Sequence, residues 1–202
     1  MNDPLARLQQ LGDIDEDTMT RLHESLTTRA EHEHLLDISY RTLDTPVGML
    51  LLAATERGLV RVAYDREDHD AVLEKLAAKV SPRILRAPKR LDPVAHELEE
   101  YFAGGRRAFD VPLDLRLAHG FRLGVLRHLS EIGYGHTESY SVVAGAAGNP
   151  RAVRAVGSAC ATNPLPVVVP CHRVVRSDGS LGGYVGGLPA KELLLGLERG
   201  AA

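Results

Sequence analysis

The sequence has little cysteine, few aromatic residues and no long hydrophobic run. Only Cys160 and Cys171 occur among 202 residues, which is too few for the disulfide framework of a small secreted domain. No apolar run approaches the ~20 residues that a membrane-spanning helix requires, and the N-terminus lacks the basic and then apolar pattern of a secretion signal. We therefore expect a cytoplasmic protein with reduced thiols and no membrane partner.

The histidines and cysteines also do not cluster as metal ligands do. Structural zinc requires four ligands in a recognisable group, and His32 and His34 have no cysteine near them in the sequence. We expect no metal site. Cys160 has no charged or basic neighbour in the sequence and is predicted to be a small packing residue.

The charge is divided unevenly along the chain. Residues 1–117 hold 16 Lys and Arg against 22 Asp and Glu, a net charge of −6, whereas residues 118–202 hold 8 against 5, a net charge of +3. The overall charge of −3 therefore hides a mildly basic C-terminal part. Such a balance favours modest contact with phosphates over a heavily charged nucleic-acid clamp.

The segment around Cys171 carries the clearest chemical signal. Three valines, residues 167–169, precede Pro170 and favour an extended, buried backbone, and Pro170 keeps Val169 out of the helical region. Only the thiolate of a cysteine attacks, and its free pKa is near ~8.5, so Cys171 needs help from its neighbours His172 and Arg173. The alternative is a buried structural cysteine beside a capping histidine. The stiff proline frame favours the nucleophile.

The sequence NPLPVVVPCHRVV resembles the active-site signature of the O6-alkylguanine-DNA alkyltransferases, in which PCHR contains the alkyl-accepting cysteine. GNPRAVRAVG upstream and GGYVGGLPAKELLLGLE downstream strengthen the resemblance, which extends from Tyr101 to Glu198 and more loosely back to Ser39. It implies DNA repair by transfer of an alkyl group from O6 of a flipped guanine to Cys171. Because a thioether has no ready hydrolytic exit, each molecule would act once. No cofactor is expected.

The resemblance also implies residue roles. Glu198 would orient His172, and a water molecule would join His172 to Cys171, because neighbours on an extended strand do not face each other. Tyr140 would hydrogen-bond N3 of the extruded guanine. The remaining pocket positions are Asn163, the family's hinge asparagine, together with Val174, Tyr184, and Val185, where the family often has serine.

Residues 139–161 predict a helix-turn-helix. Ser139 can cap a short helix over residues 140–146, and Asn149-Pro150 can begin a second helix over residues 151–161. The small residues of the second helix permit close approach either to another helix or to DNA. The resemblance favours DNA, through minor-groove contact with little sequence preference. The predicted DNA contacts are Arg154, which would fill the gap left by the flipped nucleotide, Arg151 to phosphate, and Ala152, Ala155 and Ser139.

The predicted fold has three parts. Residues 1–36 form an acidic helical extension of unknown role, and residues 37–117 an α/β scaffold. This scaffold has a three-stranded antiparallel sheet, helices over 68–80 and 93–102, and a further short strand near 82–85. Residues 118–202 form a mainly α domain with the helix-turn-helix, ending in a helix whose buried face is Leu193, Leu194 and Leu197. The resemblance implies a ribonuclease-H-like N-terminal layer. We expect a monomer.

Two other functions remain open. The helix-turn-helix fits a DNA-binding regulator for which alkylation is the signal, although the family's sensor members carry a cysteine-rich zinc module and this chain has no spare cysteines. A cysteine hydrolase is the other alternative, but the base is adjacent to the nucleophile and the usual oxyanion-hole signals are absent.

Overall fold

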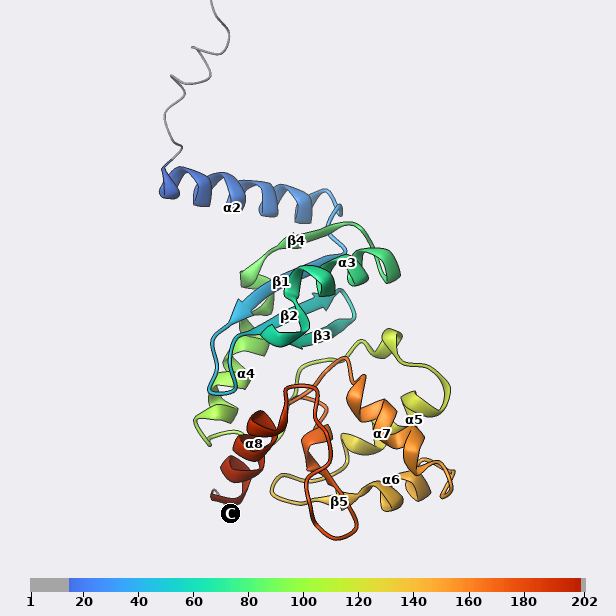
Figure 1. Ribbon diagram of the computed structural model, residues 1–202. Coiled ribbons are helices and arrows are strands. Elements are labelled where there is room, and N and C mark those ends of the chain that lie inside the picture. Colours follow the sequence, from blue (N-terminus) through green and yellow to red (C-terminus); the bar gives the residue numbers. More distant parts are fainter. Residues whose placement is uncertain (1–14, 201–202) are drawn as a thin grey trace, which may run out of the picture. The chain divides into compact units, whose positions relative to one another are not determined.

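The computed structural model describes residues 15–200 and divides after Leu36 into two compact units (Figure 1). In the first unit, the predicted helix is α2 (Glu16–His32), and the Asp15 carboxylate accepts a hydrogen bond from the Thr18 N–H at 2.7 Å, as expected for a cap. Met19, Leu22 and Leu26 recur at helical spacing along α2. Each of them is more than half exposed.

The second unit, residues 37–202, begins with a sheet. The predicted antiparallel meander is β1 (Ile38–Leu43), β2 (Leu50–Thr55) and β3 (Gly58–Tyr64). A fourth strand, β4 (Ile84–Arg86), pairs parallel to β1, so the order is β3-β2-β1-β4 and the sheet is mixed and four-stranded. The extra strand lies where the sequence suggested one. Helix α3 (His69–Lys79) lies in the connection from β3 to β4.

Both faces of the sheet are covered, which explains why β2 is apolar from Leu50 to Ala54. Leu51 on one face packs with Val72 and Leu76 of α3. Leu50 and Leu52 on the other face belong to a larger core that includes α4 (Asp92–Phe102). The same core contains residues of every helix of the C-terminal half, so the sheet and the C-terminal helices are packed as one body.

The C-terminal half consists of α5 (Gly120–Leu129), α6 (Tyr140–Ala146), α7 (Val153–Ala161) and α8 (Leu188–Gly200). Helices α6 and α7 form the predicted helix-turn-helix. The second helix begins at Val153, later than predicted, because the Asn149 side chain accepts a hydrogen bond from the Arg151 N–H at 3.2 Å and holds a turn, which leaves Ala152 as the cap. Within residues 15–200, no helix has the length and apolarity needed to cross a membrane.

Short elements complete the second unit. They are the 3-10 turns η1 (Asp65–Glu67), η2 (Pro88–Leu91), η3 (Leu115–Leu117) and η4 (Cys171–Arg173), and the strands β5 (Glu138–Ser139) and β6 (Val174–Val175). In the segment over residues 109–115, Leu113 forms an isolated parallel bridge with Leu59.

Candidate active site

The backbone before Cys171 is not the extended strand that three valines predicted. Residues 166–168 form a turn and residue 169 a bend, and Val167 has φ 72°, in the left-handed region that β-branched residues rarely adopt. The reason is the prolines at 164, 166 and 170, which have no N–H to donate to a strand ladder. Cys171 itself begins the 3-10 turn η4, and the backbone becomes extended only at β6.

Strands β5 and β6 bring the start of the helix-turn-helix next to this turn. They pair in parallel, with Glu138 opposite Val174 and Ser139 opposite Val175. The Ser139 hydroxyl accepts a hydrogen bond from the Val142 N–H at 3.3 Å and so caps α6. Tyr140, the first residue of α6, therefore lies close to the cysteine segment.

The Tyr140 phenol packs against Gly182 so closely that a Cβ at that glycine would collide with its hydroxyl. Burial raises the pKa of Tyr140 to about 12. The phenol is therefore protonated at neutral pH, and it can act as a hydrogen-bond donor.

Cys171 is buried, with 1% of its surface exposed. The Asn163 side-chain amide donates to the Cys171 sulfur at 3.1 Å and to the Val169 carbonyl at 2.8 Å, while its oxygen accepts from the Leu165 N–H at 2.9 Å. Burial raises the pKa of Cys171 to about 11, against the opposing effects of the Asn163 hydrogen bond and the Lys191 charge. The resting thiol is protonated at neutral pH, so its reaction requires a base.

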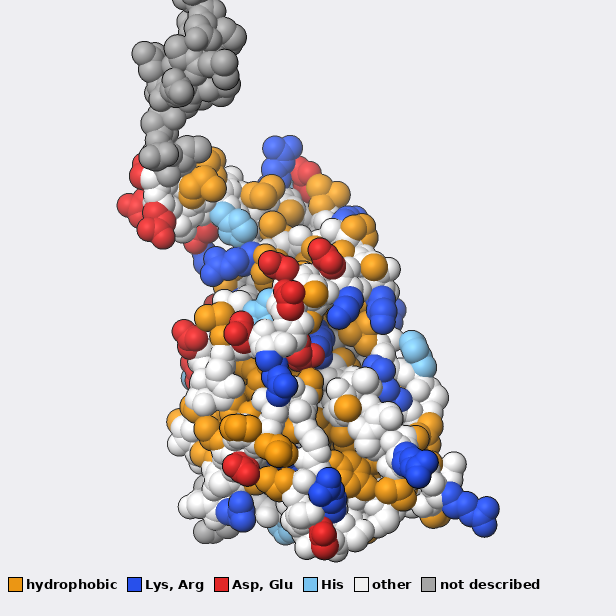
Figure 2. Space-filling view, viewed as in Figure 1, with side chains coloured by type: hydrophobic (Ala, Val, Ile, Leu, Met, Phe, Trp, Pro, Cys, Tyr) orange, Lys and Arg blue, Asp and Glu red, His pale blue; other side chains and the backbone are white. Residues whose placement is uncertain are grey.

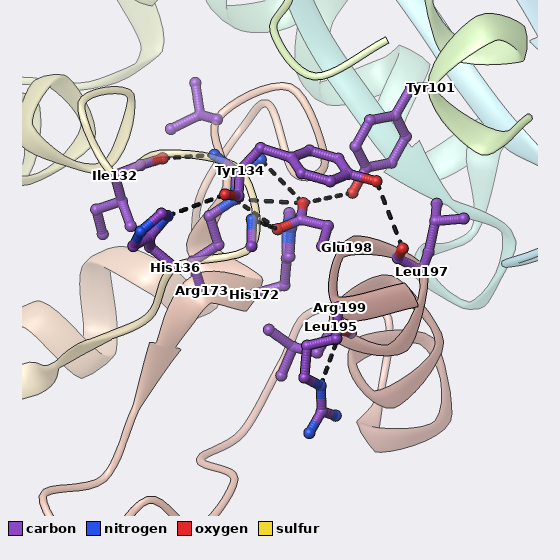
Figure 3. A network of polar contacts seen from close by, with 12 residues as sticks. Tyr101, Ile132, Tyr134, His136, His172, Arg173, Leu195, Leu197, Glu198 and Arg199 are labelled. Atoms are coloured by element: carbon purple, nitrogen blue, oxygen red, sulfur yellow. Dashed lines mark hydrogen bonds and ion pairs between the residues drawn. The ribbon is translucent and has the colours of Figure 1, made fainter. Parts of the chain in front are cut away.

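Glu198 is the centre of a polar network that includes His172, the residue after Cys171 (Figure 3). Its Oε1 accepts from His172 Nε2 at 2.9 Å and from the Tyr101 hydroxyl at 2.7 Å. The Arg173 guanidinium donates to both oxygens, at 2.9 Å from Nε and from Nη2, and the Gly135 N–H donates at 3.1 Å. Burial alone would raise the pKa of Glu198, but the hydrogen bonds from His172 and Arg173 hold it well below its usual range.

These contacts fix the protonation state of His172. Burial lowers the pKa of His172 and outweighs the opposing effect of Glu198, so the imidazole is neutral at neutral pH. Since the Glu198 carboxylate accepts at Nε2, the proton belongs on that nitrogen, an assignment made from the hydrogen-bond network. The other nitrogen, Nδ1, is then an unprotonated base. It is buried and has no hydrogen-bond partner among residues 15–200.

Arg173 is not the positive charge that promotes ionisation of the Cys171 thiol, although its position in the sequence suggested this role. Its guanidinium is engaged by Glu198 and by the Ile132 carbonyl at 2.5 Å, where it compensates the buried carboxylate. The charge beside Cys171 comes instead from Lys191, whose ammonium is fully buried and donates to the Val174 carbonyl at 2.5 Å.

The buried face of α8 also differs from the prediction. It consists of Ala190, Lys191, Leu194, Leu195 and Glu198, whereas Leu193 is 38% exposed. Lys191 and Glu198 are seven residues apart and share the stripe of Leu194 and Leu195. A charged residue at the same helical phase as buried leucines is the sequence signal that would have identified Lys191, whereas Glu198 was already predicted from the resemblance.

The remaining pocket residues lie around the same turn. Val174 is fully buried, and Val185 is partly buried. The Tyr184 ring stands edge-on to the His172 ring, with centroids 6.3 Å apart, and its hydroxyl is hydrogen-bonded to that of Tyr64 at 2.9 Å. No role had been predicted from the sequence for Tyr64, Tyr101 or Lys191.

The exposed face of the helix-turn-helix carries the predicted DNA contacts. Arg151, Arg154 and Ala155 are exposed and Ala152 is partly exposed. The two arginine side chains form no hydrogen bond or ion pair with any described residue. Figure 2 shows basic side chains projecting at the lower right of the molecule, over α6 and α7 in Figure 1. These side chains are available to phosphates.

Cys160 offers a contrast to Cys171. It is buried on α7, and burial raises its pKa well above the ordinary range. Its sulfur accepts no hydrogen bond from the described residues. Among these residues, no group of three or more His, Cys, Asp and Glu side chains is arranged to hold a metal ion.

A buried cysteine followed by a buried, neutral histidine, in the same body as an exposed helix-turn-helix, is the arrangement expected of a protein that performs thiol chemistry on DNA. Comparison with known families specifies the class further. The 6-O-methylguanine DNA methyltransferase family matches twice, with its ribonuclease-like domain over residues 38–115 and its DNA-binding domain over residues 120–200. The chain belongs to this family.

Individual relatives agree. A methylated-DNA–protein-cysteine methyltransferase of Mycolicibacterium paratuberculosis is 40% identical over 162 residues, which cover 80% of this chain and 93% of that protein. The inducible one of Bacillus subtilis is 40% identical over 152 residues, 75% of this chain and 84% of that protein. The crystal structure of Mycobacterium tuberculosis O6-methylguanine methyltransferase has a TM-score of 0.72 at 37% identity, covering 82% and 94% of the two chains. A structure of the M. tuberculosis protein with DNA gives the same TM-score over 81% and 94%.

Proposed function

We propose that this protein repairs DNA by transferring an alkyl group from O6 of guanine to Cys171, once per molecule. The observation that carries the proposal is the bond from His172 Nε2 to Glu198, which leaves an unprotonated Nδ1 on the residue that follows the cysteine. The family membership and the exposed helix-turn-helix support DNA as the substrate.

The reaction begins with deprotonation of Cys171. Its thiol proton passes to His172 Nδ1 through a bridging water molecule, and the Glu198 carboxylate stabilises the imidazolium that forms. The Asn163 amide and the Lys191 ammonium stabilise the thiolate, since both lower its pKa. A barrier to thiolate formation remains in the resting protein, where the pKa is about 11.

The thiolate then attacks the alkyl carbon. A sulfur–carbon bond forms as the carbon–O6 bond breaks, and guanine leaves with the electron pair and regains a proton, so the thiol hydrogen ends on guanine. Tyr140, protonated because its pKa is about 12, donates a hydrogen bond to the base as negative charge develops. The thioether that remains on Cys171 has no hydrolytic exit.

The guanine must leave the duplex before this step, because its O6 atom is stacked and paired there. In our proposal the second helix, α7, enters the minor groove, with Arg154 in the gap left by the flipped nucleotide and Arg151 on phosphate. Exposed Ala155, together with Ala152 and Ser139, permits close approach of the nucleic-acid backbone. The protein acts as a monomer in a reducing compartment, the cytoplasm, which keeps Cys171 as a thiol.

Intact-mass analysis after incubation with a duplex containing O6-methylguanine tests the proposal. We expect a single methyl group per protein molecule, located on the Cys171 peptide, and none in Cys171→Ala, which still binds DNA. Cys160→Ala is the matched control and should be methylated fully. Product in excess of protein would instead indicate a hydrolase, and binding without any transfer would indicate a regulator.

A further inference from the structure

A glycine-rich turn, residues 182–187, lies between β6 and α8 and is called the pocket wall below. Other parts of the protein pack against both of its ends. The Gly187 N–H donates to the Tyr184 carbonyl at 3.0 Å, and the Lys191 N–H donates to the Gly187 carbonyl at 3.2 Å, so the turn leads directly into α8. At one end of the segment, Gly182 packs under Tyr140 of the helix-turn-helix. At the other end, Gly186 packs against Tyr64, the last residue of β3.

Tyr64 makes several contacts with this wall. Its hydroxyl is 2.9 Å from the Tyr184 hydroxyl, and the two rings stand edge to face with centroids 5.8 Å apart at 77°. A Cβ at Gly186 would lie 2.5 Å from the Tyr64 ring, so only glycine permits this approach. The guanidinium of Arg66, two residues further on, covers Gly187 in the same way.

Tyr64 is itself rigidly placed. It is 3% exposed, and its backbone N–H donates to the Glu67 side chain at 2.9 Å. Burial raises the pKa of Tyr64 well above its usual value, so the phenol stays neutral and the contact between the two hydroxyls is a true hydrogen bond. The sheet thus fixes Tyr184, whose ring also stands edge-on to the His172 ring.

We propose that Tyr64 is a positioning residue that determines which alkyl groups reach Cys171. It acts through Tyr184 and Gly186, by holding the wall that contains Val185 against the β-sheet; this inference rests on the proposed function. If one of the two hydroxyls is removed, the hydrogen bond between Tyr64 and Tyr184 is lost and the pocket wall is no longer fixed. The pocket then accepts bulkier alkyl groups. Pocket changes on the scale of one methylene alter discrimination by about 10–200-fold.

Tyr64→Phe tests the inference, because it removes only the hydroxyl. Tyr40→Phe is the matched control, since Tyr40 lies in the same sheet but packs with the α3 side. The measurements are single-turnover rates of transfer to Cys171 from duplexes containing O6-methylguanine or O6-benzylguanine, and the thermal unfolding of each variant. We expect the benzyl-to-methyl rate ratio to rise about tenfold in Tyr64→Phe and to stay unchanged in Tyr40→Phe.

Tyr184→Phe completes a double-mutant cycle. If the two hydroxyls act as one contact, Tyr184→Phe should raise the ratio as Tyr64→Phe does, and the double variant should add little. Equal slowing of both substrates, or lower thermal stability with an unchanged ratio, would overturn the inference and leave Tyr64 an ordinary core residue. A wild-type protein that transfers neither group would instead refute the proposed function.

Discussion

Tyr101 and Glu198, 97 positions apart in the sequence, are joined by a buried hydrogen bond of 2.7 Å. Tyr101 belongs to α4, in the part of the chain predicted to be only a scaffold, and Glu198 belongs to the last helix. The carboxylate that orients His172 is therefore held partly by the N-terminal layer. Through Tyr101 and Tyr64, this layer contacts the site at two places.

Tyr101→Phe should lower the free energy of unfolding by about 1.5–3 kcal/mol, the usual contribution of a hydrogen bond to a charged group. It should also slow alkyl transfer, because Glu198 then holds His172 less firmly. Urea unfolding at pH 7 and single-turnover rates provide the measurements. Tyr134→Phe is the control: its hydroxyl makes only a 3.5 Å contact with the Leu197 carbonyl, so its loss should be smaller. Equal losses of unfolding free energy in the two variants would contradict a specific role for the hydrogen bond from Tyr101 to Glu198.

Glu198→Gln should change how stability depends on pH. The pKa of Glu198 is depressed in the folded protein relative to its ordinary 4.5, so its stabilising effect is complete above pH 4.5 and is lost as the pH falls towards the folded value. At pH 7 the variant should be less stable by about 3–5 kcal/mol, because Arg173 loses its buried partner. That deficit should shrink below pH 4.5.

Urea unfolding of both proteins between pH 7 and pH 2.5 measures this deficit directly. Glu192→Gln on the exposed side of α8 is the matched control and should leave the curve unchanged. A deficit that stays constant to the lowest pH would show that the Glu198 charge is not what stabilises the fold.

Asn163→Ala should raise the pKa of Cys171 above its present value of about 11, because the amide hydrogen bond lowers that pKa. In a Cys160→Ala background, the rate of alkylation by a small reagent reports Cys171 alone. Its rise with pH should shift to higher pH in the variant. Asn149→Ala, which removes an exposed asparagine in the helix-turn-helix turn, should leave the titration in place. An identical curve for Asn163→Ala would mean that the amide does not stabilise the thiolate.

The sequence predicted what depends on local spacing. The meander over β1–β3 and both helices of the helix-turn-helix follow from alternation, helical periodicity and turn residues, and the structure confirms them. Val167 shows where local propensity fails: prolines on both sides exclude a strand, and burial of the turn outweighs the preference of valine for extended backbone. The prediction for Arg173 was wrong because it relied on the adjacent Cys171, whereas the ion-pair partner of Arg173 is Glu198, 25 residues away.

Contacts between the two halves could not be predicted from either half alone. Tyr64 and Tyr101 have ordinary positions for core aromatic residues, on a buried strand and on a buried helix face, and nothing near them in the sequence distinguishes them. Their importance comes from the docking of α8 and its preceding turn against the sheet. The charged residues within the apolar stripe of α8 are the local signal that this helix has a polar partner, and the family resemblance pointed to Glu198 alone.

Arg154→Ala should impair repair of duplex DNA far more than reaction with a free modified base. Extruding a stacked and paired nucleotide costs a few kcal/mol, and less where pairing is already poor. A side chain that fills the vacated space stabilises only the flipped state. The deficit in transfer rate should therefore decrease in the order paired duplex, mismatched duplex, single strand and free O6-benzylguanine. Arg57→Ala, which removes an exposed arginine from the turn between β2 and β3, is the control and should show no such order.

Arg154→Lys distinguishes filling of the gap from simple phosphate contact. Lysine keeps the charge but cannot stack as a planar guanidinium does, so it should rescue little if Arg154 occupies the space of the flipped nucleotide. If Arg154 binds only phosphate, lysine should rescue well, and the deficit should follow salt concentration instead of base pairing. The Arg154 side chain has no partner among the described residues, so neither substitution breaks a contact within the fold. Transfer rates of the two variants on the four substrates, at two salt concentrations, therefore report on the interaction of residue 154 with DNA and not on folding.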